Sequence, residues 1–193
     1  MRRHARRLLA AIGATATLAV LAPDAAAASR AGSSDVTAGA SRPVFKMPFR
    51  CGQKWLGSNW DGHSPAHSID WNHYDAGGSP NDFGRRVLAS AGGEVVASYY
   101  STGTGYGNTV VIAHGNGWQT RYSHLRTRDV RRGDHVGRGR VIGQVGASSA
   151  LYDLSPHLHY EQIHDGRVVV AVVQGVTWSD HLKRYQVSAN GCG

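Results

Sequence analysis

The stretch NTVVIAHGNGWQTRYSHL, residues 108–125, is typical of a β-hairpin. Two runs rich in β-branched and aromatic residues flank the short segment HGNG at 114–117. An Asn-Gly pair favours a tight turn in which both residues have positive φ, and such turns join antiparallel strands. We therefore predict two adjacent antiparallel strands joined at Asn116–Gly117.

Apolar runs separated by glycine-containing turns continue on both sides of this hairpin. Residues 85–100, RRVLASAGGEVVASYY, predict two strands joined at Gly92–Gly93. Residues 158–173, LHYEQIHDGRVVVAVV, predict a second pair that turns at Asp165–Gly166. No window shows a long 3.6-residue hydrophobic period, which argues against helices. We predict a mainly β protein, an antiparallel β-sheet domain with long loops at its N-terminal end.

The N-terminal part of the chain differs in composition from the rest. Four arginines precede the apolar run LLAAIGATATLAVLA and the small residues DAAAAS, the pattern of a secretory signal peptide. We predict a signal peptide over residues 1–28 and a flexible linker over 29–42, which has little apolar surface to bury. Residues 43–193 are predicted to form one domain. The protein is expected to be secreted, with no stable membrane anchor.

The formal net charge is +8, and it falls to +5 without residues 1–28, which hold four arginines and one aspartate. A positive charge on an exported protein suits an anionic surface such as a bacterial cell wall. The sequence has no dense Lys/Arg stripe and no nucleic-acid motif, which argues against nucleic-acid binding. We expect a monomer.

The chain contains two cysteines, Cys51 and Cys192. An even number of cysteines in an exported chain favours a disulfide. A bridge between these two would close nearly the whole predicted domain into one loop, which stabilises by about 4–5 kcal/mol on the loop-entropy model. Two free buried thiols are the alternative.

Histidines and one aspartate are the candidate metal ligands. A catalytic zinc ion takes three protein ligands and keeps one position for water. His157 and His159, in SPHLHYEQ, would share one face of a strand, although two histidines on a solvated face are equally simple. Asp70 lies in the apolar setting SIDW, where a carboxylate needs a cationic partner unless it caps a turn.

Four segments in this order resemble the M23 zinc metallopeptidases, the lysostaphin- and LytM-like peptidoglycan endopeptidases. They are HSPAHSIDWN, GYGNTVVIAHGNGWQTRYSHL, VRRGDHVGRGRVIGQVG and SPHLHYE, which together span roughly residues 60–163. The resemblance implies an antiparallel β domain whose long loops form an open groove, a bound Zn²⁺, and a metal-activated water. The implied reaction is hydrolysis of peptide bonds in cell-wall peptidoglycan.

The resemblance also implies roles for individual residues. His159 and Asp70 match zinc ligands of the family. His157 matches the catalytic histidine of the H-x-H pair, and His124 matches the second active-site histidine. His114 matches a histidine that family members carry without using it on the metal.

The first zinc-ligand motif departs from the common family form, His-x-x-x-Asp. The residue four positions before Asp70 is Ala66. Longer family versions, in which a loop separates the two ligands, favour His63. Strand parity weakly opposes His67, because residues i and i+3 of an extended segment face opposite sides. We therefore take His63 as the third ligand and keep His67 as the alternative.

Other functions remain possible from the sequence. An M23-like domain could be catalytically silent and bind cell wall or a regulatory partner, or a zinc protease could act on secreted proteins. A serine hydrolase would need Ser155 or Ser123 with a histidine and Asp153, but no G-x-S-x-G motif is present. Glu161 and Asn108 are candidates for orienting the imidazoles.

Overall fold

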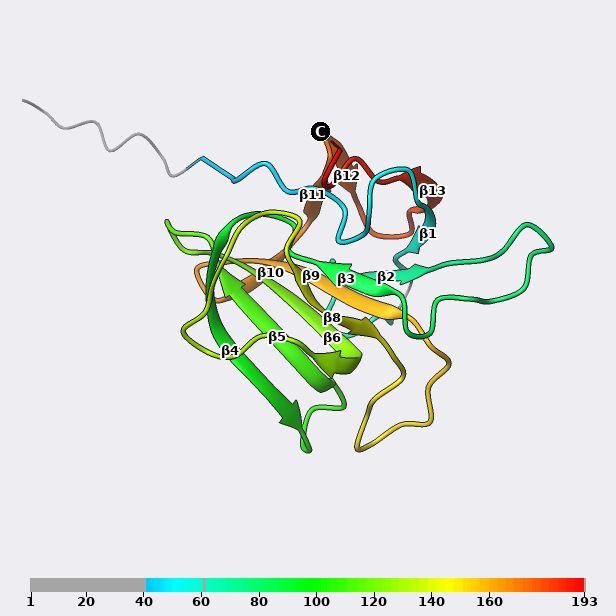
Figure 1. The fold of residues 1–193 in the computed structure, drawn as a ribbon, viewed down its shortest axis with the longest axis horizontal. Coiled ribbons are helices and arrows are strands. Elements are labelled where there is room, and N and C mark those ends of the chain that lie inside the picture. The colour runs from blue at the N-terminus through cyan, green and yellow to red at the C-terminus, as the bar shows by residue number, and fades with distance from the viewer. Residues whose placement is uncertain (1–40, 61, 193) are drawn as a thin grey trace, which may run out of the picture. The chain divides into compact units, whose positions relative to one another are not determined.

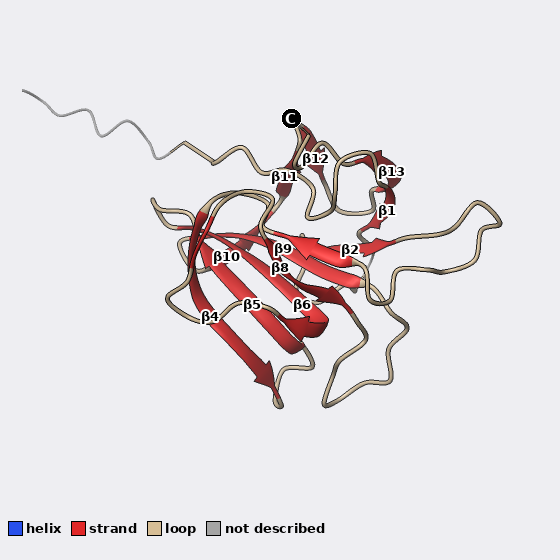
Figure 2. Cartoon of the chain, viewed as in Figure 1, coloured by secondary structure: helices blue, strands red, loops and turns tan. Residues whose placement is uncertain are grey.

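The computed structural model describes residues 41–60 and 62–192. The predicted signal peptide and nearly all of the predicted linker therefore lie outside the described residues. The described part contains thirteen strands and no helix, which confirms the mainly β class (Figure 2). Within that part, no helix is long and apolar enough to cross a membrane.

The strands are short, and their bounds follow. They are β1 (Lys54–Ser58), β2 (Ile69–Asn72), β3 (Arg86–Leu88), β4 (Gly93–Ser101), β5 (Gly107–Ala113), β6 (Trp118–Arg128), β7 (His135–Val136), β8 (Val141–Val145), β9 (Leu158–His164), β10 (Arg167–Val169), β11 (Ala171–Val173), β12 (Val176–Trp178) and β13 (Lys183–Val187).

Eleven of these strands form one antiparallel sheet (Figure 1). Its neighbours run in the order β13-β1-β2-β9-β6-β5-β4-β7, while β10 pairs with β9, and β8 pairs with both β3 and β6. Strands β11 and β12 form a separate pair. The order places β2, from early in the domain, beside β9, from late in it, and this pairing is what assembles the site described below.

Two of the predicted hairpins are confirmed. β5 and β6 pair around Gly115, Asn116 and Gly117, whose φ angles are 85°, 49° and 75°. β9 and β10 pair around Asp165–Gly166, with φ angles of 48° and 77°. In both turns the backbone needs positive φ, which asparagine, aspartate and glycine adopt most readily.

The hairpin predicted at Gly92–Gly93 is wrong. β3 pairs with β8, and β4 pairs with β5 and β7, so the two runs are not partners of each other. Gly93 opens β4, and a Cβ atom there would lie 2.1 Å from the carbonyl oxygen of Ala113. Glycine is needed at this position because two backbones approach closely, and no turn forms there.

Long loops precede β1 and join β2 to β3, as predicted, and a further one over residues 146–157 joins β8 to β9 (Figure 1). The core between the strands is rich in large aromatic residues. Trp55, Trp71 and Trp178 are fully buried, and Phe49 stacks on Trp55 with ring centroids 3.5 Å apart. Burial of such large rings removes much apolar area from water and thereby stabilises the packing of the loop before β1 on the sheet.

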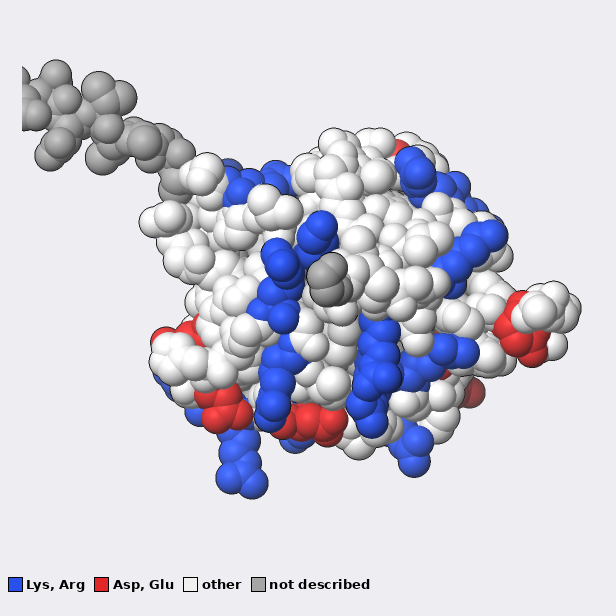
Figure 3. Space-filling model, turned by 45° about the horizontal axis from the view of Figure 1, so that its top comes forward, with Lys and Arg blue, Asp and Glu red and all other residues white. Residues whose placement is uncertain are grey.

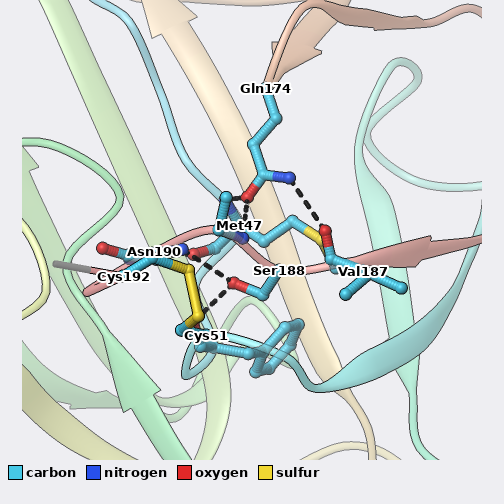
Figure 4. Close-up of a disulfide and its surroundings, with 9 residues drawn as sticks. Met47, Cys51, Gln174, Val187, Ser188, Asn190 and Cys192 are labelled. Atoms are coloured by element: carbon cyan, nitrogen blue, oxygen red, sulfur yellow. Dashed lines mark hydrogen bonds between the residues drawn. A yellow bond between two sulfur atoms is a disulfide. The ribbon is translucent and has the colours of Figure 1, made fainter.

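The predicted disulfide is confirmed. Cys51 and Cys192 are bonded, with Cα atoms 5.2 Å apart and a sequence separation of 141 (Figure 4). Next to the bridge, Asn190 Nδ2 donates to the carbonyl oxygen of Met47 at 2.9 Å. The last described residues are thus tied to the loop that precedes β1.

Candidate metal centre

Three neighbouring strands present polar side chains to one face of the sheet. In the strand register, Asp70 of β2 lies opposite His159 of β9, and His159 lies opposite Ser123 of β6. The flanking pair Trp71 and Leu158 is fully buried. Because side chains alternate between faces, packing of the apolar neighbours in the core forces Asp70 and His159 onto the opposite face together.

Asp70 is the centre of a cluster of imidazoles. His63 Nε2 lies 2.9 Å from Asp70 Oδ2, and His159 Nδ1 lies 3.2 Å from Asp70 Oδ1. One ligand atom from each of these three residues lies within 4.8 Å of the others. His157 Nε2 lies 3.8 Å from Asp70 Oδ1, at the edge of the same cluster.

Ser68 determines which ring nitrogen of neutral His63 carries the hydrogen. The Ser68 hydroxyl donates its single hydrogen to the carbonyl oxygen of Pro65, so it accepts the hydrogen bond from His63 Nδ1 at 2.9 Å. In the neutral imidazole the second nitrogen then carries no hydrogen. His63 therefore turns an unprotonated Nε2 toward the Asp70 carboxylate.

Glu161 likewise determines which ring nitrogen of His159 carries the hydrogen. Its side chain is fully buried, and His159 Nε2 lies 3.0 Å from Glu161 Oε1. Burial opposes ionisation, but the hydrogen bond from His159 and the nearby charges outweigh it and lower the pKa of Glu161. An ionised carboxylate only accepts hydrogen bonds, so Nε2 holds the hydrogen and Nδ1 faces Asp70.

The charges of the cluster depend strongly on one another. Burial raises the pKa of Asp70, but the hydrogen bond from protonated His159 and the charge of that ring outweigh it and hold that pKa well below its usual range. Burial lowers the pKa of His159, whereas its hydrogen bonds to Asp70 and Glu161 raise it to about 9. Without a metal, His159 therefore keeps an extra proton at neutral pH.

The donor set fits a divalent cation. With neutral rings, two unprotonated nitrogens face the two oxygens of Asp70, and such a set of acceptors is stabilised by a positive charge between them, a proton in the metal-free protein or a metal ion. Zinc bonds of about 2.0–2.2 Å in a tetrahedral site place ligand atoms roughly 3.3–3.6 Å apart. The separations from Asp70 to His63 and His159, 2.9 Å and 3.2 Å, are close to that range.

Two other histidines lie away from the cluster. His67 Nδ1 lies 3.0 Å from Asp180 and not near Asp70. His114 donates from Nδ1 to the carbonyl oxygen of Gly92 at 2.8 Å, and its Nε2 lies 2.8 Å from the Thr120 hydroxyl. The geometry thus brings His63 to Asp70 and leaves His67 and His114 in separate hydrogen bonds.

His157 and His124 stand side by side next to the candidate ligands. Their ring centroids are 4.8 Å apart, and the His124 ring lies 5.7 Å from that of His159. His157 Nδ1 donates to the carbonyl oxygen of Ser155 at 2.8 Å, and His124 Nδ1 donates to that of Ser148 at 3.0 Å. Burial and the neighbouring His157 lower the pKa of His124 to about 4.

Sequence reasoning missed three residues that support the cluster: Ser68, Tyr106 and Arg121. Tyr106 and Arg121 both contact the Glu161 carboxylate, at 2.7 Å each. Of the two suggested orienting residues, Glu161 contacts His159, whereas Asn108 Nδ2 donates to the carbonyl oxygen of Leu125. Opposite charges on two strands would have indicated the Arg121–Glu161 pair only if the strand register had been known.

The serine alternatives find no support in the geometry. The Ser123 hydroxyl is buried, 3.1 Å from the Thr109 hydroxyl. Ser155 contacts His157 through its backbone carbonyl oxygen. Neither serine hydroxyl shows a hydrogen bond to a histidine in the described part of the chain.

The antiparallel sheet and its cluster of histidines around one aspartate agree with the arrangement that the resemblance to M23 metallopeptidases implies. The sequence model of Peptidase family M23 matches residues 78–171, which include His124, His157 and His159. Residues 78–171 of the chain thus belong to this family. His63 and Asp70 precede the matched residues, so their assignment rests on the geometry above.

Two curated relatives are consistent with the family match. Peptidoglycan DD-endopeptidase ShyA of Vibrio cholerae is 39% identical over 82 residues, 42% of this chain and 19% of the relative. DD-carboxypeptidase/endopeptidase Mpg of Neisseria meningitidis is 42% identical over 86 residues, 45% of this chain and 19% of the relative. This chain thus spans about a fifth of the length of each.

A solved structure shares the fold. It is the M23 metalloprotease pseudoalterin, from the deep sea, with a TM-score of 0.55 and 19% identity. The alignment covers 77% of this chain and 97% of that one. At this identity the likeness bears on the fold alone.

Proposed function

We propose that this protein is a zinc-dependent endopeptidase that cleaves peptide bonds of bacterial cell-wall peptidoglycan. The observation that carries the proposal is the meeting of His63, Asp70 and His159 with His157 and His124 beside them. Zinc would be held by His63 Nε2, an Asp70 oxygen and His159 Nδ1. Two neutral imidazoles and one carboxylate leave such a site with a net positive charge. The bound ion would supply a water of lowered pKa and would polarise the scissile carbonyl.

His157 is suited to move the proton. Because its Nδ1–H donates to the carbonyl oxygen of Ser155, its Nε2 is an acceptor in the neutral ring, and this atom lies 3.8 Å from Asp70 Oδ1. Nε2 would accept the proton that the attacking water loses. The same nitrogen would then donate it to the departing amine, since a general base becomes a general acid in the second half of the reaction.

His124 is suited to orient the water. Its Nδ1–H is held by the carbonyl oxygen of Ser148, so its Nε2 also accepts a hydrogen bond when the ring is neutral. Because burial lowers the pKa of His124 to about 4, the ring stays neutral near pH 7 and is a poor proton acceptor. It would therefore position the water while His157 takes the proton.

The substrate class rests on the relatives and on surface charge. ShyA is named a peptidoglycan DD-endopeptidase, and Mpg is named a DD-carboxypeptidase/endopeptidase. Figure 3 shows Lys and Arg side chains gathered across the middle of one face, with few Asp or Glu among them. A basic surface favours contact with anionic wall polymers. The protein would bind its substrate outside the cytoplasm, in an open groove.

Digestion of purified peptidoglycan tests the proposal. We expect the purified protein to release peptides with new amino termini, chelation to stop the release, and added zinc to restore it. Mass analysis of the fragments would identify the bond cut. A zinc-loaded protein that releases nothing from peptidoglycan but cleaves secreted proteins would replace this substrate class. A protein without zinc and without activity would instead support a silent binding domain.

A further inference from the structure

Glu161 is a buried carboxylate with three donors around it. It lies on β9 two residues after His159, and its side chain has no exposed surface. Its oxygens lie 3.0 Å from His159 Nε2, 2.7 Å from the Tyr106 hydroxyl and 2.7 Å from Arg121 Nη1. A buried charge is strongly destabilising unless it is paired and hydrogen-bonded, and here every contact also fixes the direction of the carboxylate.

The strand register explains why Arg121 is at this place. Arg121 of β6 lies opposite Glu161 of β9, just as Ser123 lies opposite His159 two positions further along. The ion pair therefore occupies the same face of the sheet as the candidate metal ligands. Its position is set by backbone pairing on both strands, which makes it more rigid than a contact between loops.

Tyr106 joins the pair from a third segment. Its hydroxyl donates to Glu161 and accepts from Arg121 Nη1 at 3.1 Å, and the guanidinium lies over its ring at 4.8 Å. Its backbone carbonyl oxygen also accepts the amide of His124 at 2.9 Å. Tyr106 thus contacts both Glu161, which orients His159, and the backbone amide of His124.

We propose that Tyr106 and Arg121 are positioning residues for the metal: they hold Glu161 so that His159 keeps its hydrogen on Nε2 and turns Nδ1 toward Asp70 and His63. The inference rests on the proposed zinc site and adds to it the residues that select Nδ1 as the nitrogen of His159 that binds. A carboxylate behind a metal-bound histidine fixes its tautomer and strengthens binding. Here that carboxylate is itself oriented by two further side chains.

Two conservative variants test the inference. Tyr106→Phe removes one hydroxyl and leaves the backbone contact to His124, and Arg121→Lys keeps the charge but loses the planar guanidinium. Zinc affinity is measured by competition with a chromophoric chelator. We expect each variant to bind zinc about tenfold more weakly, the lower end of the range for such supporting contacts. The matched controls Tyr100→Phe and Arg128→Lys, at exposed positions of β4 and β6, should bind as the wild type does.

A spectroscopic readout separates positioning from general destabilisation. Cobalt replaces zinc in the wild type and both variants, and its visible absorption bands report the ligand geometry. The two variants should shift or weaken these bands, and the controls should not. Metal-free Tyr106→Phe should melt within a few degrees of the metal-free wild type, because one hydroxyl is lost and Arg121 still pairs with Glu161.

The possible outcomes are distinct. If the wild type binds zinc and Tyr106→Phe matches it in both affinity and cobalt spectrum, the inference is wrong while the proposed function stands. If the wild type binds no zinc, the proposed function itself fails. Should Arg121→Lys not fold, Tyr106→Phe alone decides, since a folded variant with unchanged metal binding contradicts the positioning role.

Discussion

His159 and His157 are two residues apart, yet their surroundings suit them to different roles, His159 to metal binding and His157 to proton transfer. His159 is buried between two carboxylates, whereas His157 reaches the cluster only at its edge. We expect His159→Ala to lose zinc and activity together. We expect His157→Ala to keep zinc within about threefold and to lose turnover by about 10²–10⁴, the usual contribution of a general acid–base group. Metal analysis and peptidoglycan digestion check both. Loss of zinc in the His157 variant would contradict the assignment.

His63 and His67 form a matched pair, because both lie in the same loop and only one contacts Asp70. His63→Ala removes a candidate ligand and should lower zinc affinity by at least 100-fold. His67→Ala breaks a half-exposed contact to Asp180 and should leave the affinity unchanged. Dialysis against buffered zinc, followed by metal analysis, compares the two. Zinc retained in the first variant and lost in the second would reverse the choice.

The pKa of His159 predicts how the metal-free protein responds to pH. Its pKa rises to about 9 because Asp70 and Glu161 accept hydrogen bonds from the protonated ring, while an unfolded histidine titrates near 6.5. Its contribution to stability is thus complete below about pH 6.5 and is lost as pH rises through about 9. Thermal melts of chelator-treated protein should show Tm falling over this window. His159→Asn should remove that slope; an unchanged slope would assign it to other groups.

At the scale of strands, the sequence predicts turns well and partners less well. Asn116 and Asp165, each followed by glycine, predicted real hairpins because positive φ is a local property of those residues. Gly92–Gly93 gave the same signal for a different reason, the close approach of β4 to the end of β5. A glycine pair does not say which of these causes applies, and the difference depends on strands that are distant in sequence.

Gly92 and Gly93 therefore provide a test at the start of β4. A Cβ atom at position 93 would lie 2.1 Å from the Ala113 carbonyl oxygen, whereas at position 92 the nearest atom is the Val136 carbonyl oxygen at 3.5 Å. Gly93→Ala should destabilise by about 2–4 kcal/mol, since the backbone must move. Gly92→Ala should change stability by less than about 1 kcal/mol. Urea unfolding measures both, and equal effects would show that close approach is not the cause.

At the scale of the whole domain, the proposed ligands and their supports differ in how they could be found. Asp70, His157 and His159 stand in recognisable local patterns, so their candidacy needed no tertiary information. Arg121 and Tyr106 meet Glu161 only when β6 pairs with β9 and the segment before β5 folds against them, and the sequence gives no register for that pairing. Ser68 contacts His63 and Pro65 within the loop that leads into β2, and no motif in the sequence marks that contact. The choice between His63 and His67 likewise needed the loop before β2, whose path no strand pattern defines.

The disulfide acts on the domain as a whole and lies apart from the proposed site. It closes a loop of 141 positions, and its neighbours are Met47 and Asn190, which belong to neither the metal cluster nor its supports. Replacing both cysteines with serine should lower the free energy of unfolding by about 4–5 kcal/mol, mainly because the unfolded chain gains freedom. Zinc affinity should stay within about twofold wherever the variant is folded. Urea unfolding and chelator competition on the same samples separate the effect on stability from the effect on zinc binding. A large loss of zinc affinity would mean that the chain ends help to shape the site. An unchanged unfolding midpoint would mean that the disulfide constrains the unfolded chain little.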